Sequence, residues 1–434
     1  MDKPLTYRLI FKTWYPLAIS WLLMAVEFPF MSAIIARLPH AEINLAAYGG
    51  IIFPITFLMQ APVEMLLAAS TALSKDWASY TRVRRFMMWL GGVMTALHFL
   101  IAFTPLYDLV VERIIHAPVE IIAPARPGLM IMTLFTWCVA YRRFHNGAMI
   151  RFGHSRAVAV GTFLRIGVNV ALLLIGYALG GIPGVIVASV AQAVGVFAEA
   201  VYSGLRVRPV VRWQIRRAQA AETLTWKALV RFYLPLAMTT LVLFSFEFLG
   251  SMGMSRMKLP LESLAVWPVI TWFIFILQSS GIAYNEVVVA LLDKDGARPK
   301  LRMYALLLSL TLTAVTLLIT ATPLATLWFH RVSALTEPLA QLSYRAFWIF
   351  LFTPALTVMQ SWYQGALLHA QQSQPISEAV IVALVITLGV LFWGIWWGSL
   401  AGVYVAALGY TLSFAAQTAW LWYRSRPVLR PAAG

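Results

Sequence analysis

Long apolar runs separated by short polar segments extend along the whole chain. Stretches such as 170–178 and 386–398 show no polar stripe at helical period, which a surface helix of a water-soluble protein would have. A run of about 20 apolar residues spans a bilayer as a helix, whereas a β-barrel would need short alternating strands. The pattern predicts an all-α membrane protein with twelve transmembrane helices. The expected spans are 12–37, 45–74, 86–107, 121–149, 157–179, 183–205, 232–256, 264–292, 303–328, 341–368, 377–398 and 402–423.

The second half of the chain repeats the first at an offset of 219 residues, which becomes 218 after one deletion. The collinear pairs are Pro16–Ala18 with Pro235–Ala237, Leu45-Ala46 with Leu264-Ala265, Lys75-Asp76 with Lys294-Asp295, Thr104–Leu106 with Thr322–Leu324, Gly147-Ala148 with Gly365-Ala366, 184–188 with 402–406, and 206–210 with 424–428. Six spans per half is an even number, so both halves enter the membrane from the same side and form parallel repeats. The expected domains are an N-lobe at 1–205, a basic cytoplasmic linker at 206–231 that we interpret as an interfacial helix, and a C-lobe at 232–434.

Composition supports a membrane location, with 61% hydrophobic and 12% charged residues and a mean hydropathy of +0.78. If the N-terminus is inside, the inner segments hold 23 of the 33 Lys and Arg residues and the outer loops seven. This bias predicts that both termini are cytoplasmic, in the cell membrane. The net charge of +16 then reflects topology and contact with anionic lipid headgroups, not nucleic acid.

Several classes of site are not indicated. The first span lacks a small-residue cleavage site, so it is expected to remain in the protein. The single cysteine, Cys138, excludes an internal disulfide, and the seven histidines show no metal-ligand spacing. Nucleotide-binding and hydrolase motifs are absent. We therefore expect neither an enzyme nor a bound cofactor or metal.

Four glutamates inside the expected spans are candidates for ion coupling. Glu27 and Glu247 lie at nearly equivalent depths in spans 1 and 7, and Glu64 and Glu286 lie in spans 2 and 8. Ionisable residues in the membrane are costly and usually mark a cavity, a relay or an ion pair. Desolvation favours the protonated carboxyl group, so such residues can bind and release a proton as access alternates. The alternative is that each one neutralises a buried cation or caps a broken helix.

Basic residues inside the spans are concentrated in the first half. Span 4 carries Arg142, Arg143 and His145, and span 5 carries Arg165 followed one turn later by Asn169. Arginine binds carboxylates and phosphates through its planar fork, so this group predicts a site for the anionic part of a substrate. Asn169 could add a neutral hydrogen bond, although holding helices together is its more common role.

Arg142 and Arg143 cannot both point to one place, because adjacent helical residues diverge by about 100°. We expect one of them to line a central cavity with His145 and Arg165. The other is expected to pair with Glu64 or Glu199. Snorkelling of either arginine to the inner interface is the alternative.

Several short motifs resemble a known family of exporters. The acids in spans 1 and 7, with LAAYG at 45–49, are similar to the multidrug/oligosaccharidyl-lipid/polysaccharide (MOP) exporter superfamily, which includes the MATE exporters. Within it, YPLAI at 15–19, ALHFLIAFTPL at 96–106 and FYLPLA at 232–237 most resemble the progressive ankylosis protein family. The resemblance implies a V-shaped, two-lobed fold and export of small anions such as pyrophosphate, nucleoside triphosphate or citrate. Some MATE exporters hold sodium between acids of spans 7 and 10, but span 10 has no acid here, which favours protons.

Three functional hypotheses remain at this point. The first is a proton-coupled secondary exporter of a small organic or phosphorylated anion, expected to act as a monomer. The second is a flippase for a lipid-linked saccharide, which would also use arginines to hold a pyrophosphate. The third, export of cationic drugs, would require an acidic cavity without central arginines.

Overall fold

The structure is a computed structural model that describes residues 5–219 and 224–429. The described chain is helical apart from turns and one isolated bridge between Lys258 and Ala401. The elements of the first half are α1 (Tyr7–Ile35), α2 (Ala41–Ala47), η1 (Tyr48–Ile52), α3 (Phe53–Glu64), α4 (Leu66–Leu73), α5 (Trp77–Phe103), α6 (Leu106–Asp108), η2 (Leu109–Ile115), α7 (Val119–Arg151), α8 (Ser155–Leu179), α9 (Gly184–Trp213) and η3 (Ile215–Arg217). Those of the second half are α10 (Trp226–Met254), α11 (Pro260–Leu291), α12 (Ala297–Ala321), α13 (Pro323–Leu327), η4 (Trp328–Val332), α14 (Glu337–Ile349), α15 (Thr353–His369), α16 (Gln374–Trp397) and α17 (Gly402–Leu429).

The bounds of the helices confirm the internal repeat. α1 and α10 each contain 29 residues and are offset by 219 at both ends. α9 and α17 begin at Gly184 and Gly402, an offset of 218. A left-handed backbone conformation also recurs. His40 and Leu259, which lie immediately before α2 and α11, have positive φ angles of 55° and 52°.

Ten helices in the described residues are long and apolar enough to cross a membrane, and the bent pair α14–α15 makes eleven. α17, with 28 residues, occupies the twelfth expected position. Many helices begin or end several residues beyond the expected spans, because a helix can continue past the hydrocarbon core into the interface. α9, for example, continues to Trp213, so much of the expected linker is helical. The chain is an all-α, multi-pass membrane protein.

Two of the expected spans are interrupted. Span 2 is divided by a π-helical turn at Tyr48–Ile52 and by a break at Met65, where α3 ends at Glu64. Span 10 bends by 41° between α14 and α15. Pro354 lies in the first turn of α15, where its missing N–H group costs no helical hydrogen bond. The bend therefore lies directly before Pro354.

The helices pack into two compact units that exchange the first helix of each half. One unit is Ile34–Ser255, which we call the charged unit, and the other is Met1–Ala33 with Arg256–Gly434, which we call the amide unit. In the amide unit, the Trp14 indole of α1 donates to the Ser280 carbonyl of α11 at 2.9 Å. The expected lobes 1–205 and 232–434, with the linker 206–231, follow the repeat in the sequence and remain a prediction. Helix packing, by contrast, places α1 with the second half of the chain and α10 with the first.

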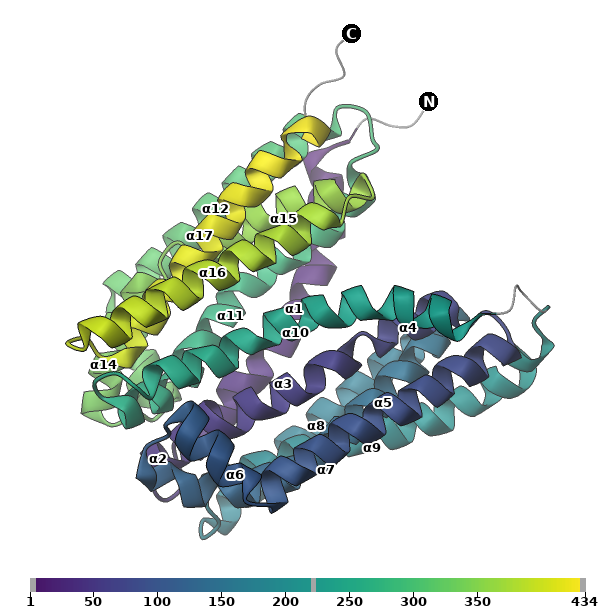
Figure 1. Ribbon diagram of the computed structural model, residues 1–434. Helices are drawn as coiled ribbons and strands as arrows, with labels where there is room; N and C mark the ends of the chain where they lie inside the picture. The colour runs from purple at the N-terminus through teal and green to yellow at the C-terminus, as the bar shows by residue number, and fades with distance from the viewer. Residues whose placement is uncertain (1–4, 220–223, 430–434) are drawn as a thin grey trace. The chain divides into compact units, whose positions relative to one another are not determined.

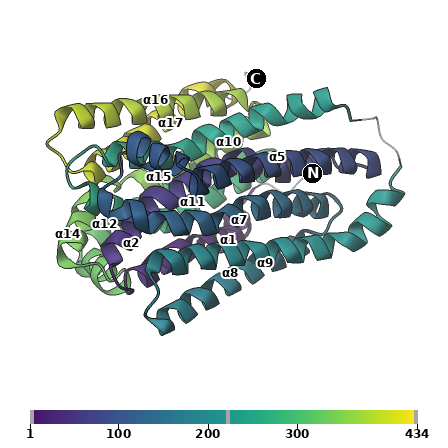
Figure 2. The ribbon, with the colours of Figure 1, turned by 60° about the horizontal axis from the view of Figure 1, so that its bottom comes forward.

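Within each unit, long helices lie side by side along much of their length. α5, α7, α8 and α9 run together in the charged unit, and α12, α15, α16 and α17 in the amide unit (Figure 1). A second view shows α7, α8 and α9 as neighbours (Figure 2). Gly147 allows α7 to pack closely against α4, because a Cβ atom there would lie 2.4 Å from the Leu67 carbonyl oxygen of α4. These close-packed helices bring the polar residues of spans 2, 4, 5 and 6 together.

Candidate functional site

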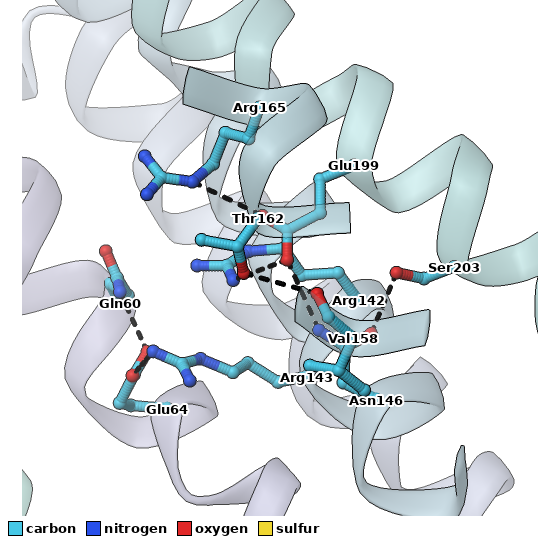
Figure 3. Close-up of polar contacts among 10 residues, drawn as sticks. All are labelled: Gln60, Glu64, Arg142, Arg143, Asn146, Val158, Thr162, Arg165, Glu199 and Ser203. Carbon is cyan, nitrogen blue, oxygen red and sulfur yellow. Dashed lines mark hydrogen bonds and ion pairs between the residues drawn. The ribbon is translucent and has the colours of Figure 1, made fainter. Parts of the chain in front are cut away.

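A buried cluster in the charged unit surrounds Glu199 of α9. The Glu199 carboxylate is fully buried and lies 3.2 Å from Arg142 Nη1 of α7 and 3.3 Å from Arg165 Nε of α8. The two arginines approach it from different sides (Figure 3). Asn146 Nδ2 donates to Glu199 Oε1 at 3.3 Å, and Ser203 Oγ donates to Asn146 Oδ1 at 2.8 Å. Three helices thus converge on one carboxylate.

A second ion pair lies beside the Glu199 cluster. Arg143 of α7 forms an ion pair with Glu64, the last residue of α3 (Figure 3). Gln60 Nε2, one turn earlier on α3, donates to Glu64 Oε2 at 2.8 Å. Because adjacent residues of a helix diverge, Arg142 and Arg143 point to different carboxylates. The sequence analysis expected only one of these arginines to form such a pair, and in the structure both do.

The two groups together contain three arginines and two glutamates. The side chains are mostly buried, with exposed fractions of 12% for Arg142, 27% for Arg143 and 12% for Arg165. Burying ions is costly unless opposite charges and hydrogen bonds compensate. Glu64 and Glu199 provide this compensation through their ion pairs with the three arginines.

The other expected anion-binding residues have separate contacts. The buried His145 side chain bonds through Nδ1 to the Tyr141 carbonyl at 2.8 Å and packs against Tyr141 and Phe144. These described contacts are with neighbours on α7 and not with the arginines. Asn169 is fully buried and donates to Gln192 Oε1 at 2.9 Å, which joins α8 to α9. Asn169 therefore has the helix-joining contact that the sequence analysis named as the more common role.

The remaining glutamates lie in different environments. Glu27 of α1 is 4% exposed, in the amide unit, whereas Glu247 of α10 is half-buried, in the charged unit. Glu286 of α11 is exposed and accepts a hydrogen bond from Trp21 Nε1 at 3.2 Å. The sequence placed these acids at comparable depths, and the structure separates them by burial.

Glu286 lines a cavity of about 470 Å³ in the amide unit. Its other polar walls come mainly from amides: Gln278 Nε2 donates to Thr357 Oγ1 at 3.0 Å, and the Tyr410 hydroxyl lies 3.3 Å from Gln278 Oε1. Trp21, Phe275, Tyr410 and Phe414 supply aromatic surface. The cavity suits a ligand with hydroxyl groups and one apolar face. Sequence analysis missed it because its amides and aromatics are common in membrane helices.

The repeat relates the two sites. At an offset of 218, Arg142 corresponds to Gln360, Arg165 to Ala383 and Glu199 to Gln417. Gln360 is buried, lines the amide-unit cavity and donates to the Phe414 carbonyl at 3.0 Å. The same helix positions therefore carry charges in one half and neutral residues, two of them amides, in the other.

No known protein family and no curated protein matches the sequence, but solved structures match the fold. An inward-facing multidrug resistance MATE family transporter of the MOP superfamily superposes with a TM-score of 0.74 at 16% identity, covering 96% of this chain and 99% of that one. The chain has the MATE transporter fold. An outward-facing MATE family transporter gives a TM-score of 0.60 at 18% identity, with 99% and 100% coverage. A MOP superfamily transporter from Pyrococcus furiosus, described by the reverse polarity of its binding pocket, gives 0.62 at 17% identity, with 99% and 100% coverage.

The MATE fold confirms the twelve-helix, two-repeat architecture expected from the sequence. It does not distinguish the progressive ankylosis family from other MOP proteins, so that closer resemblance remains a prediction. Several residues of the charged cluster escaped sequence analysis. Asn146 and Ser203 are neutral, and helix packing brings Asn146 of α7 to Glu199 and Ser203 of α9.

Proposed function

We propose that this protein is a secondary active transporter that uses alternating access to export a small organic or phosphorylated anion across the cell membrane. Pyrophosphate, nucleotides and citrate are examples of that class. The MATE fold and the ten or eleven apolar helices support a transporter. The observation that carries the substrate class is the gathering of Arg142, Arg143 and Arg165, with Glu64 and Glu199, in one mostly buried cluster.

An anion is the natural complement of this cluster. Several guanidinium groups close together can bind one carboxylate or phosphate through charge-assisted hydrogen bonds. The Pyrococcus furiosus transporter is described by a binding pocket of reverse polarity that suggests a different function for it. That description supports the idea that binding pockets of opposite polarity can occur in the same fold.

Proton and anion binding at Glu199 should favour each other. An anion that binds Arg142 or Arg165 competes with the Glu199 carboxylate for the guanidinium group, and protonation of Glu199 removes this competitor. By linkage, anion binding must then promote protonation to the same extent. A proton carried on Glu199 would therefore move with the anion, and proton entry would drive uptake.

Export by proton exchange requires a different carboxylate as the proton carrier. We assign this role to Glu27, which is the most buried of the four candidate acids, with Glu247, Glu286 and Glu64 as less buried candidates. Glu64 already forms an ion pair with Arg143.

The experiment that tests the substrate class uses purified protein in proteoliposomes. Fluxes of radiolabelled pyrophosphate, ATP and citrate are compared with that of the cationic dye ethidium. The triple variant R142Q/R165A/E199Q gives the charged unit the neutral residues that the repeat already has at Gln360, Ala383 and Gln417. We expect this variant to lose anion flux, and the matched control Gln360→Ala to retain it. Ethidium transport that is unaffected by the triple variant, without anion flux, would refute the proposal in favour of cationic-drug export.

The proton carrier is tested with Glu27→Gln and Glu199→Gln. Glutamine mimics a protonated carboxyl group, so Glu27→Gln should abolish anion efflux driven by a pH gradient but leave anion exchange at equal pH. Glu199→Gln should lower the pH dependence of the apparent KM for the anion. If Glu27→Gln leaves gradient-driven efflux intact, the proton is carried elsewhere.

The amide-unit cavity favours the flippase as the second candidate function. Aromatic faces and amides around Glu286 suit a hydroxylated ring such as a saccharide. A flippase would translocate a fluorescent lipid-linked saccharide between leaflets, which a membrane-impermeant quencher detects. Such activity, without flux of soluble anions, would replace the exporter proposal.

A further inference from the structure

A second arginine-rich cavity lies in the amide unit, away from the Glu286 cavity. It encloses about 430 Å³ between α12, α15 and α17. Arg298 and Arg302 of α12 and Arg426 of α17 line it, together with the apolar and aromatic residues Pro299, Trp362, Tyr363, Trp422 and Leu429 and the hydroxyl of Ser425. No Asp or Glu is among the described residues that line it.

The three arginines are arranged to bind one group. Arg298 and Arg302 are four residues apart, so they project from the same face of α12. Arg426 is held by stacking, with its Cζ atom 3.7 Å from the centre of a Trp422 ring. Stacking restricts the guanidinium group and leaves its edge available for hydrogen bonds.

Two acidic residues close in sequence to this cavity, Asp293 and Glu378, contact other side chains. Asp293, shortly before α12, lies 2.7 Å from His369 Nε2. Glu378 lies 3.0 Å from Arg424 Nε, two residues before Arg426. The repeated motif at 424–428 thus uses its first arginine in an ion pair and directs its second to the cavity. These acids therefore do not account for the positive charge that lines it.

The position and the walls of the cavity identify the ligand class. It lies at the ends of α12 and α17 that the charge bias predicts to be cytoplasmic, where anionic headgroups attract arginine. Arginines beside the exposed Trp422 and the half-buried Leu429 match a molecule with a phosphate group and an apolar body. We infer that this cavity binds the phosphate group of an anionic phospholipid, as a site separate from the proposed substrate cluster.

Binding of phosphatidylglycerol and phosphatidylcholine to the detergent-purified protein, followed by native mass spectrometry, tests the inference. We expect the R302Q/R426Q variant to bind phosphatidylglycerol about tenfold more weakly, because two charge-assisted contacts are lost. Binding of phosphatidylcholine should be much weaker than that of phosphatidylglycerol and should not change in the variant. Arg302→Lys and Arg426→Lys keep the charge and lose the planar fork, so each should fall between the wild type and the double variant.

The repeat supplies a matched control. Arg208 corresponds to Arg426 at the offset of 218, but the cavity that it lines contains no second arginine. Arg208→Gln should therefore leave phosphatidylglycerol binding unchanged. If the double variant elutes as aggregate, the single variants Arg302→Gln and Arg426→Gln provide the same comparison.

A second arm distinguishes a lipid from a soluble phosphate compound. Inorganic pyrophosphate is added to the delipidated protein, and its effect on the thermal unfolding midpoint is measured in the wild type and in R302Q/R426Q. Stabilisation by pyrophosphate that requires these arginines, without selective lipid binding, would overturn the lipid assignment in favour of a soluble ligand. Equal phosphatidylglycerol binding by the wild type and the variants would overturn the site itself. Because the test measures binding and not flux, it can fail while the proposed transport function stands.

Discussion

Where α7 carries Arg142, the repeat places Gln360 on α15, and where α9 carries Glu199, it places Gln417 on α17. The helix packing of the two halves is nevertheless closely similar. A Cβ atom added at Gly176 would lie 2.3 Å from Val187, and one added at its counterpart Gly394 would lie 2.3 Å from Val405. Close backbone packing thus persisted in both halves while buried polar chemistry diverged. A helix satisfies its own backbone hydrogen bonds, so polar side chains can change without altering the helix.

The two halves also differ in where their helices break. In the first half, span 2 is interrupted at Tyr48–Ile52, whereas its counterpart α11 continues from Pro260 to Leu291. In the second half, span 10 bends between α14 and α15, whereas α7 is unbroken. The unbroken α7 carries both Arg142 and Arg143 at a fixed angle, which keeps their two ion pairs apart.

The largest difference between the halves should be the cost of removing the central side chain. Glu199→Leu would leave Arg142 and Arg165 buried without their shared carboxylate, so we expect a loss of about 3–5 kcal/mol. Gln417→Leu, at the equivalent position, should cost about 1 kcal/mol or less. Thermal unfolding in detergent measures both. Equal losses would show that the charges around Glu199 are compensated by something other than this carboxylate.

The glycine contacts should be the next most sensitive. An added Cβ at Gly147 would lie 2.4 Å from the Leu67 carbonyl oxygen, whereas at Gly365 it would lie 2.7 Å from Val288 Cβ. We expect Gly147→Ala and Gly365→Ala to cost about 1–3 kcal/mol each, with the larger loss at Gly147. Gly167→Ala on α8 meets open space and should be neutral or slightly stabilising. A destabilised Gly167→Ala would mean that these losses do not arise from close helix packing.

A smaller contrast is expected at the start of α9 and α17. Asn44 Oδ1 accepts from the Val185 amide at 3.2 Å, and its counterpart Ser263 Oγ accepts from the Val403 amide at 3.1 Å. Asn44 also donates to the Pro39 and His40 carbonyls. We expect Asn44→Ala to cost about 1–2 kcal/mol and Ser263→Ala about 0.5–1 kcal/mol. Chemical denaturation can rank them, and the reverse order would indicate that the additional Asn44 bonds contribute nothing.

The smallest loss of stability should come from replacing the whole charged triad. R142Q/R165A/E199Q removes both signs of charge at once, and exchanging buried ion pairs for neutral residues is often neutral or stabilising. Its unfolding midpoint should lie near that of the wild type and well above that of Glu199→Leu. If the triple variant is as unstable as Glu199→Leu, then the cluster holds the helices together, and its role in anion binding loses support.

Much of the fold could be predicted from the sequence. The apolar runs predicted the membrane helices, and the offset of 218–219 predicted their recurrence, because both depend only on the order of residues along the chain. The pairing of Arg143 with Glu64 and of Arg142 with Glu199 was anticipated in part, since buried charges require partners and few were available. Helix ends were less predictable, as α5 and α9 show, because interfacial residues can continue a helix.

Only the tertiary structure decided which distant residues meet. It brought Arg165 and Asn146 to Glu199, and it grouped α1 with the second half and α10 with the first. It also assembled the cavities around Glu286 and Arg426 from helices far apart in sequence. The physical reason is that hydropathy determines which segments enter the membrane, whereas the shapes and polar groups of facing helices determine how those segments pack.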